Sequence, residues 1–359
     1  MNVRPFTKHR ILTAASALVA GSILLTACAP GSDSASAGEN NDTLVVYSNS
    51  VSDGRGDWLK AQAAEAGFDV ELVDLGGGDV MNRLSAEKNN PIADLTFGMN
   101  NVYFEKLKAQ DVLEPYTPAW SGEVDAAMSD EAGKTFWPIV REPIMLVVND
   151  AAYKPADAPK DWTELWTKDA FKGRYEVPLA STGATTQMVY AGILARYADP
   201  KGELGISQEG WDQMAAYFEH GNTAVKGEDL YARMKAGTVD AGQMWLAGKN
   251  SREAEYGLKT TAVQPEIGVP FSVQHVAMVK GTDQAAEAQD FIDWFGSAKV
   301  QADWSNEFFT APTNTKAVAN ADQQAIAQTN AFTPQDIDWA LVAENIDAWV
   351  EKIELEYRK

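Results

Sequence analysis

Short runs of hydroxyl, amide and glycine residues stand where strands of this chain are expected to end, and such runs can bind a small anion. The clearest is STGAT at residues 181–185, which opens an expected helix. The free N–H groups at a helix N-terminus favour phosphate or carboxylate, and the hydroxyls add donors. Ser and Thr are also ordinary N-caps, so a purely structural interpretation stays open. The candidate anion-binding residues are Ser48, Asn49 and Ser50, then Asn100 and Asn101, and finally Ser181, Thr182, Gly183, Ala184 and Thr185.

Arg141 is a further candidate, because it stands with Glu142 in a long extended segment where a side chain could point into a cleft. Its planar guanidinium matches a carboxylate or phosphate with two parallel hydrogen bonds. The alternative is an Arg–Glu surface pair, which contributes little stability.

The sequence carries no recognisable catalytic or metal-binding motif. It lacks HExxH, GxSxG and GxxxxGK[ST], and the glycine run at residues 76–78 is not followed by the Lys-Ser/Thr of a phosphate loop. The single cysteine, Cys28, excludes an intrachain disulfide framework and a Cys-rich zinc site. We therefore expect no enzymatic activity, no cofactor and no bound metal.

The charge balance argues against nucleic acid as a partner. The chain has 359 residues, with 30 Lys and Arg against 51 Asp and Glu, which gives a net charge of −21. A surface this acidic repels phosphate backbones. The length suggests about two domains of ordinary size.

The first 28 residues have the layout of a secretory signal. Basic Arg4, Lys8 and Arg10 precede an apolar run at residues 11–25, which is too short for a confident membrane span. The ending LTAC resembles a bacterial lipobox, in which Cys28 is acylated and becomes the mature N-terminus. A plain signal peptide with an incidental cysteine, or an uncut signal anchor, would be the alternatives. Residues 29–42 are all small or polar and are expected to form a flexible tether.

The elements that must position the candidate residues follow an alternating pattern. Residues 43–48, 68–75 and 92–98 read as strands, and helical patterns at residues 57–66 and from Val80 to Pro91 separate them. Such alternation is typical of βαβ units with a parallel sheet covered by helices.

Two long extended segments, at residues 136–149 and 267–280, enclose a second α/β pattern. The first contains Pro138 and Pro143, so it could be one edge strand or two strands. We expect an α/β fold of two parallel-rich mixed sheets flanked by helices and joined by two crossing strands. The expected parts are residues 1–27 (signal), 28–42 (lipidated Cys28 and tether), 43–141 with 271–332 (lobe 1), 142–270 (lobe 2) and 333–359 (C-terminal helix).

Several segments in this order resemble bacterial extracellular solute-binding proteins, above all the ferric-iron, thiamine and phosphonate group. The resemblance covers most of residues 43–315. It implies a type II periplasmic-binding fold and a lipid-anchored receptor outside the cytoplasmic membrane, which passes a small solute to the permease of an ABC importer. The segments that carry it are the lipobox and tether, TLVVYS, VMNRLSAEKNNPIADLTFGMNN, REPIMLVVN, QHVAMVKGT and AAEAQDFIDWFGS.

The resemblance adds two site residues. Trp245 lies where relatives commonly place a ligand-contacting side chain, and it could stack on a flat or cationic solute. His275 could also contact the ligand, although a lone histidine is more often structural. The family's iron members typically use neighbouring tyrosines, and this chain has no Tyr-Tyr pair.

The preferred solute is a phosphonate, phosphate ester or carboxylate, with an iron chelate or thiamine as the alternative. A surface adhesin and a secreted hydrolase remain open as alternatives from other classes. We expect a monomer.

Overall fold

The computed structural model describes residues 43–358, so the expected signal peptide, Cys28 and the tether lie outside the described residues. Lobe 1 begins with three parallel strands, in the order β2-β1-β3. Most of their apolar residues are buried, and Leu44 and Val46 are fully inaccessible. The strands are β1 (Thr43–Ser48), β2 (Asp69–Asp74) and β3 (Leu95–Asn100).

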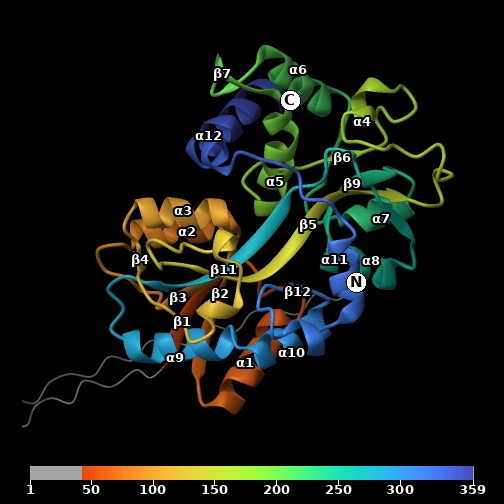
Figure 1. Cartoon of the computed structure of the whole chain (residues 1–359). Coiled ribbons are helices and arrows are strands. Elements are labelled where there is room, and N and C mark those ends of the chain that lie inside the picture. Colours follow the sequence, from red (N-terminus) through yellow and green to blue (C-terminus); the bar gives the residue numbers. More distant parts are fainter. Residues whose placement is uncertain (1–42, 359) are drawn as a thin grey trace, which may run out of the picture. The chain divides into compact units, whose positions relative to one another are not determined.

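Helices cover both faces of this sheet (Figure 1). One face packs against α1 (Arg55–Ala66), α9 (Ala285–Phe295) and α10 (Ala298–Phe308), and its core holds Phe97, Phe291 and Trp304. The other face packs against α2 (Gly77–Ala86) and α3 (Asn101–Ala109). Lobe 1 therefore combines the start of the chain with a segment more than 150 residues later.

Two strands run side by side between the lobes, β5 (Trp137–Asn149) and β11 (Phe271–Val279) (Figure 1). The first part of β5 pairs with β11, ending at Pro143, and with β12 (Ala311–Pro312). From Ile144 onward, β5 pairs instead with β9 (Ala241–Trp245) and β10 (Thr260–Ala262). The segment is thus one strand that serves both lobes, and Pro143 lies where the partners change.

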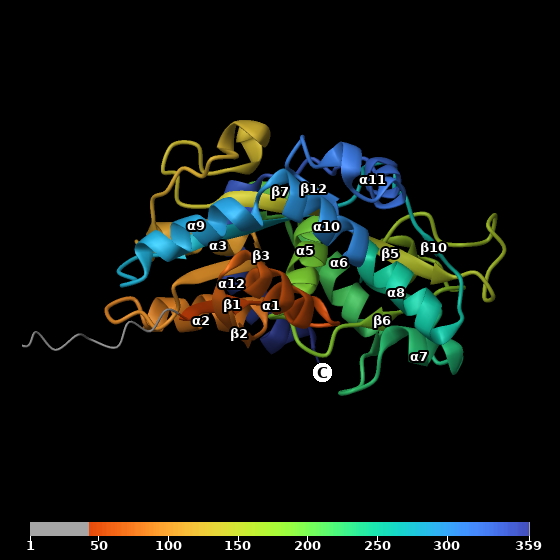
Figure 2. The ribbon, with the colours of Figure 1, turned by 90° about the horizontal axis from the view of Figure 1, so that it is seen from below.

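Lobe 2 surrounds the second half of β5, and its strand β10 lies at the opposite end of Figure 2 from α2 and α9. The pairs that β5 makes here are antiparallel, while β6 (Glu176–Val177) and β8 (Asn222–Thr223) form a separate parallel pair. The mixed sheets and their helical cover confirm the expected α/β class. The other elements are β4 (Leu113–Glu114), α4 (Glu164–Thr167), α5 (Ala184–Leu194), β7 (Ala198–Glu203), α6 (Gln208–Glu219), α7 (Leu230–Lys235), α8 (Leu246–Tyr256) and α11 (Gln323–Asn330).

The last helix begins later than the sequence predicts. A helix is expected from Thr333, but α12 spans Trp339–Lys352 and is capped by the side chain of Asp338. Residues 333–335 are extended because Val269 donates to the Thr333 carbonyl at 2.9 Å and Gln335 donates back to the Val269 carbonyl at 2.8 Å. The apolar stripe of α12 then completes the core of lobe 2.

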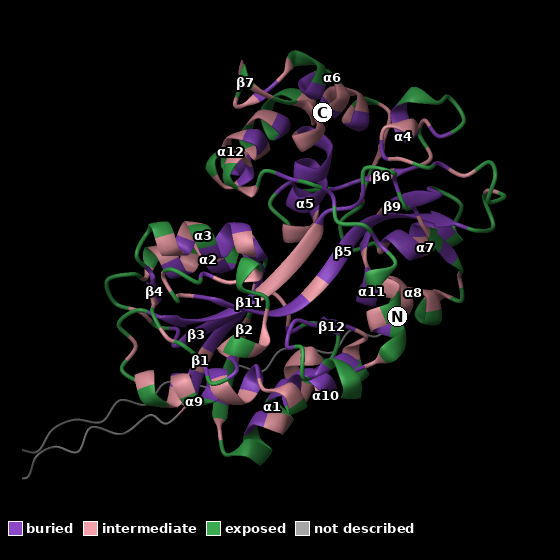
Figure 3. Cartoon of the chain, viewed as in Figure 1, coloured by how far each residue is buried: buried purple, intermediate pink, exposed green. Residues whose placement is uncertain are grey.

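Buried residues concentrate on the strands, and exposed residues on the outer helix faces and loops (Figure 3). Within residues 43–358, no helix is long and apolar enough to cross a membrane. The expected lobe boundary at residues 141–142 lies just before β5 changes partners, and the one at 270–271 falls at the start of β11.

Candidate ligand-binding cleft

A small cleft of about 160 Å³ lies where the two lobes meet the crossing strands. Lobe 1 contributes the loop after β1, lobe 2 contributes the start of α5, and the floor comes from β5 and β11. The cleft is lined by Asn49, Ser50, Ser52, Arg55, Gly98, Glu142, Ile144, Ala184, Thr185, Trp245, Ser272, Gln274, Trp304 and Thr310.

The lobe 1 wall is a turn held by Ser48. The Ser48 hydroxyl is buried and accepts a hydrogen bond from the Ser50 N–H at 2.9 Å, which places Asn49 and Ser50 at the cleft. The neighbouring Gly98 has φ +97°, and a Cβ there would lie 2.6 Å from the Ser50 Cβ. Glycine is therefore required at residue 98 for the turn after β1 to pack against β3. The Asn49 Oδ1 is buried without a hydrogen-bond partner among the described residues.

Arg55 supplies the positive charge of the cleft lining. It is the first residue of α1, and its side chain is 13% exposed. Its guanidinium lies 3.7 Å from an Asp53 oxygen and 5.1 Å from the centre of the Phe308 ring. Arg55 is absent from the residues predicted to line a ligand site, although a cation in the first turn after a polar strand-end loop is a usable signal.

The lobe 2 wall is the N-terminus of α5. Gly183 is the N-cap and has no side chain to occupy the first N–H groups of the helix. Ala184 and Thr185 line the cleft at this end. Free N–H groups at a helix start carry partial positive charge and suit an anion.

The floor is a chain of hydrogen bonds that joins the lobes through both crossing strands. The Ser50 hydroxyl donates to Gln274 Oε1 at 3.1 Å, and Gln274 Nε2 donates to Glu142 Oε2 at 3.3 Å. The Ala247 N–H, at the start of α8, donates to Glu142 Oε1 at 3.2 Å. Burial raises the pKa of Glu142, and the nearby Arg55 opposes that shift.

Of the predicted residues, the cleft brings together Asn49, Ser50, Ala184, Thr185 and Trp245. Trp245 is also the N-cap residue of α8. The remaining residues lie outside this cleft, and most of them have structural partners.

Ser181 and Thr182 are held by other parts of the fold. The Ser181 N–H donates to Glu354 at 2.9 Å, and its hydroxyl lies 3.1 Å from that of Tyr190. The Thr182 carbonyl accepts a hydrogen bond from the Tyr103 hydroxyl at 3.2 Å, which is a contact between the lobes.

Arg141 lies on the other face of β5 from Glu142. Its guanidinium donates to the Asn330 side chain and lies 5.8 Å from the centre of the Phe271 ring. Successive residues of a strand point to opposite faces, so Arg141 lies away from the cleft that Glu142 lines.

Asn100, Asn101 and His275 are also outside the cleft. The Asn100 side chain caps α3 by accepting from the Tyr103 N–H at 3.4 Å. Asn101 and His275 line a separate cavity of about 240 Å³ with Val273, on the other face of β11 from Ser272 and Gln274. The His275 Nε2 lies 2.7 Å from the Met128 carbonyl oxygen, and burial lowers the pKa of His275 to about 4.

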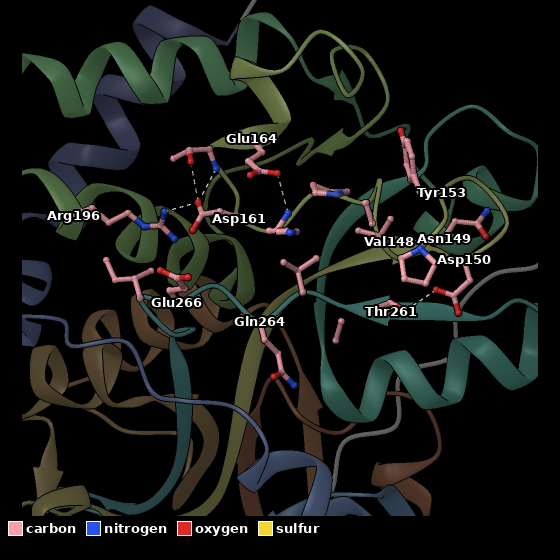
Figure 4. A pocket seen from close by; sticks show the side chains of 18 of the residues that line it. Val148, Asn149, Asp150, Tyr153, Asp161, Glu164, Arg196, Thr261, Gln264 and Glu266 are labelled. Atoms are coloured by element: carbon pink, nitrogen blue, oxygen red, sulfur yellow. Dashed lines mark hydrogen bonds and ion pairs between the residues drawn. The ribbon is translucent and has the colours of Figure 1, made fainter.

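A larger cavity of about 1060 Å³ lies in lobe 2 beside the end of β5 (Figure 4). Several of its polar side chains pair with one another. Arg196 contacts Asp161 at 2.6 Å, and the Thr261 hydroxyl donates to Asp150 at 2.7 Å. Lobe 1 contributes no lining residue, so this cavity is not positioned to sense lobe closure.

The described residues do not form a ready-made metal-binding site. Among residues 43–358, no cluster of three or more His, Cys, Asp or Glu side chains could hold a metal ion.

Comparison with known proteins places the chain in a family. Residues 57–334 match the family of bacterial extracellular solute-binding proteins. A probable ABC transporter periplasmic-binding protein of Sinorhizobium fredii is 36% identical over 89% of this chain and 87% of its own length. A putative 2-aminoethylphosphonate-binding periplasmic protein of Salmonella paratyphi A is 27% identical over 41% of this chain and 43% of its own length.

Solved structures show the same fold. The periplasmic binding protein P5PA superimposes with a TM-score of 0.73 at 20% identity, over 88% of this chain and 99% of its own. Iron-bound HitA of Pseudomonas aeruginosa has a TM-score of 0.73 at 17% identity, over 87% of this chain and 99% of its own. AfuA of Actinobacillus pleuropneumoniae, with fructose-6-phosphate bound, has a TM-score of 0.70 at 18% identity, over 87% of this chain and 99% of its own. The two-lobed periplasmic-binding fold expected from the sequence is confirmed.

Proposed function

Because this chain belongs to the bacterial extracellular solute-binding proteins of ABC importers, we propose that its cleft captures a small solute bearing a phosphonate, phosphate ester or carboxylate. One observation carries the proposal. Arg55 of lobe 1 and the uncapped start of α5 of lobe 2 line the same small cleft.

The electrostatics of the cleft suit an anion despite the net charge of −21. Arg55 pairs only loosely with Asp53, at 3.7 Å, so its guanidinium keeps donors for a ligand. The α5 terminus adds N–H groups whose positions are fixed by the helix. An anion held by both would gain from two donor sets that belong to different lobes.

Capture by lobe closure follows from this arrangement. A ligand that touches both lobes stabilises the closed form relative to the open one. Two ion pairs connect the lobes. Arg252 of α8 lies 3.6 Å from Asp53, and Lys106 of α3 lies 2.6 Å from Asp347 of α12.

Lipidation of Cys28 is part of the proposal, since it would hold the receptor beside its permease at the extracytoplasmic face of the membrane. Replacing Cys28 with Ser should release the protein into the soluble fraction. A protein that stays in the membrane fraction would contradict the lipid anchor.

An iron chelate or thiamine is the second candidate. Trp245 lines the cleft and is an aromatic candidate for contact with a flat ligand. A chelate with free carboxylates would also use Arg55, whereas bare iron lacks a ligand cluster in the described part of the chain.

A binding screen with the purified full chain tests the proposal. Phosphonates, phosphate esters, carboxylates, thiamine and ferric citrate are compared by thermal shift, and hits are measured by calorimetry. Arg55→Gln should weaken binding of an anionic hit at least tenfold, about 1.4 kcal/mol. Lys60→Gln is the matched control, because Lys60 is exposed on the same helix and outside the cleft. Equal affinity in Arg55→Gln and the wild type would overturn the anion site.

A further inference from the structure

A carboxylate shares the small cleft with Arg55. Glu142 is 5% exposed, and both of its oxygens accept hydrogen bonds, from the Ala247 N–H and from Gln274. Within residues 43–358, no Lys, Arg or His lies within ion-pair distance of Glu142. Its hydrogen-bond donors are neutral, so its negative charge is not balanced by a contacting cation.

A buried carboxylate is unfavourable in a cleft that binds only an anion. Removing a charge from water is costly unless the charge is paired, and a ligand anion nearby would add repulsion. Burial raises the pKa of Glu142, with Arg55 as the charged group that opposes this. A neutral side chain could accept the Ala247 N–H equally well. A cation on the ligand would give the carboxylate a specific role.

Aromatic side chains near Glu142 suit the same cation. Trp245 is paired with Ile144 across β9 and β5, two residues along the strand from Glu142, and both Trp245 and Ile144 line the cleft. Organic ammonium groups bind favourably over tryptophan faces.

We propose that the solute is a short zwitterion, with an amine bound by Glu142 and an anionic group bound by Arg55 and the start of α5. This inference rests on the proposed function. The two charged side chains line one cleft of about 160 Å³, which is the volume of about five water molecules, so the two ends of the ligand must be only a few bonds apart.

The test compares solutes that differ only in the amine. The pairs are 2-aminoethylphosphonate with ethylphosphonate, and β-alanine with propionate, each titrated into the full chain by calorimetry. We expect the wild type to prefer the amine-bearing member of at least one pair by tenfold or more. An equal or stronger affinity for ethylphosphonate and propionate would overturn the zwitterion while leaving the proposed anion site intact.

Variants then assign the amine to Glu142. Glu142→Gln should reduce the preference to threefold or less, mainly by weakening the amine-bearing solute. Glu307→Gln removes the same charge from an exposed residue of α10 and should keep the full preference. Arg55→Gln should weaken both members of a pair.

The outcomes separate the two proposals. A preference that survives in Glu142→Gln would contradict the role of Glu142. A wild type that binds no member of either pair, but binds a simple phosphate ester or a dicarboxylate, would refute the zwitterion alone. If none of the tested anions binds, the proposed function is refuted as well. If Glu142→Gln does not unfold cooperatively, the wild-type comparison still decides whether an amine is recognised.

Discussion

The two faces of the crossing strands differ in what they do with charged and polar residues. On one face, Glu142, Ser272 and Gln274 line the cleft between the lobes. On the other face, Arg141 is bound to Asn330, and His275 is packed between Phe104 and Phe136. Adjacent residues on one strand thus have opposite surroundings, because the pleat turns each side chain away from the last.

This contrast shows that residue type alone does not identify a ligand residue. Arg141 has the better chemistry for an anion, whereas Glu142 has the position. The cation of the cleft comes instead from Arg55, which enters from a helix of lobe 1.

Placing a phenylalanine on each face of β11 in turn should produce the largest difference in solute affinity. Ser272→Phe places a ring in the 160 Å³ cleft and should abolish solute binding, by more than about 1,000-fold or 4 kcal/mol. Val273→Phe, on the opposite face, should change the affinity less than threefold. Calorimetry with the solute found in the screen measures both. Equal losses in the two variants would show that the cleft is not the binding site.

Lowering the pH should destabilise the protein through His275, which lies on the face of β11 opposite the cleft. Burial lowers the pKa of His275 from 6.5 to about 4, so the unfolded chain binds more protons between these values. This contribution is fully present above pH 6.5 and is lost as the pH falls toward 4, for a total of about 3 kcal/mol. Titration of the His275 ring by NMR measures the pKa directly. A value of 6 or above would contradict the expected environment.

Neutralising the cleft carboxylate should stabilise the empty protein. Burial raises the pKa of Glu142 above its ordinary value of 4.5, so stability is lost as the pH rises from 4.5 through the raised value, and the loss is complete above it. Glu142→Gln should therefore increase the free energy of unfolding by about 1 kcal/mol at pH 8, roughly 2 °C in melting temperature. The gain should shrink near pH 4. Thermal melts at both pH values measure it, and a destabilised variant at pH 8 would instead indicate that Glu142 mainly supports the floor.

Arg141→Gln should have the smallest effect. The variant loses a partly exposed hydrogen bond to Asn330, so stability should fall by about 0.5 kcal/mol or less and solute affinity should change less than twofold. Binding and melting measurements on the same preparation check both. A tenfold loss of affinity would show that Arg141 contributes to ligand binding, as predicted from the sequence.

Much of the fold follows from local sequence patterns. The β-branched run of β1, the apolar segment of β3 and the long segments at β5 and β11 can be recognised as strands, and the crossing arrangement follows from the length of β5 and β11. The start of α12 could not be predicted from the local sequence, because residues 333–335 pair with Val269, which is 64 or more positions earlier in the chain. Thr333 and Pro334 are residue types that favour the start of a helix, but this pairing keeps them extended.

Only the cleft residues that directly follow strand ends could be predicted from the sequence. Asn49, Ser50 and Thr185 stand at such ends and line the cleft. Arg55 depends on where α1 begins, and Trp304 and Thr310 enter from a segment about 250 residues after Asn49. Sequence spacing carries no information about such distant neighbours, and it does not tell which face of β5 receives Glu142.

The order in which the chain is synthesised gives the interleaved strands one more consequence. The lobe 1 sheet has no β11 until residues 271–279 have been made, and the lobe 2 core includes Trp349 and Ile353 from the final turns. A chain that ends early therefore leaves both lobes incomplete. Only a fully translated chain can complete both lobes around the cleft, so prematurely terminated chains should not compete with intact receptors for the solute.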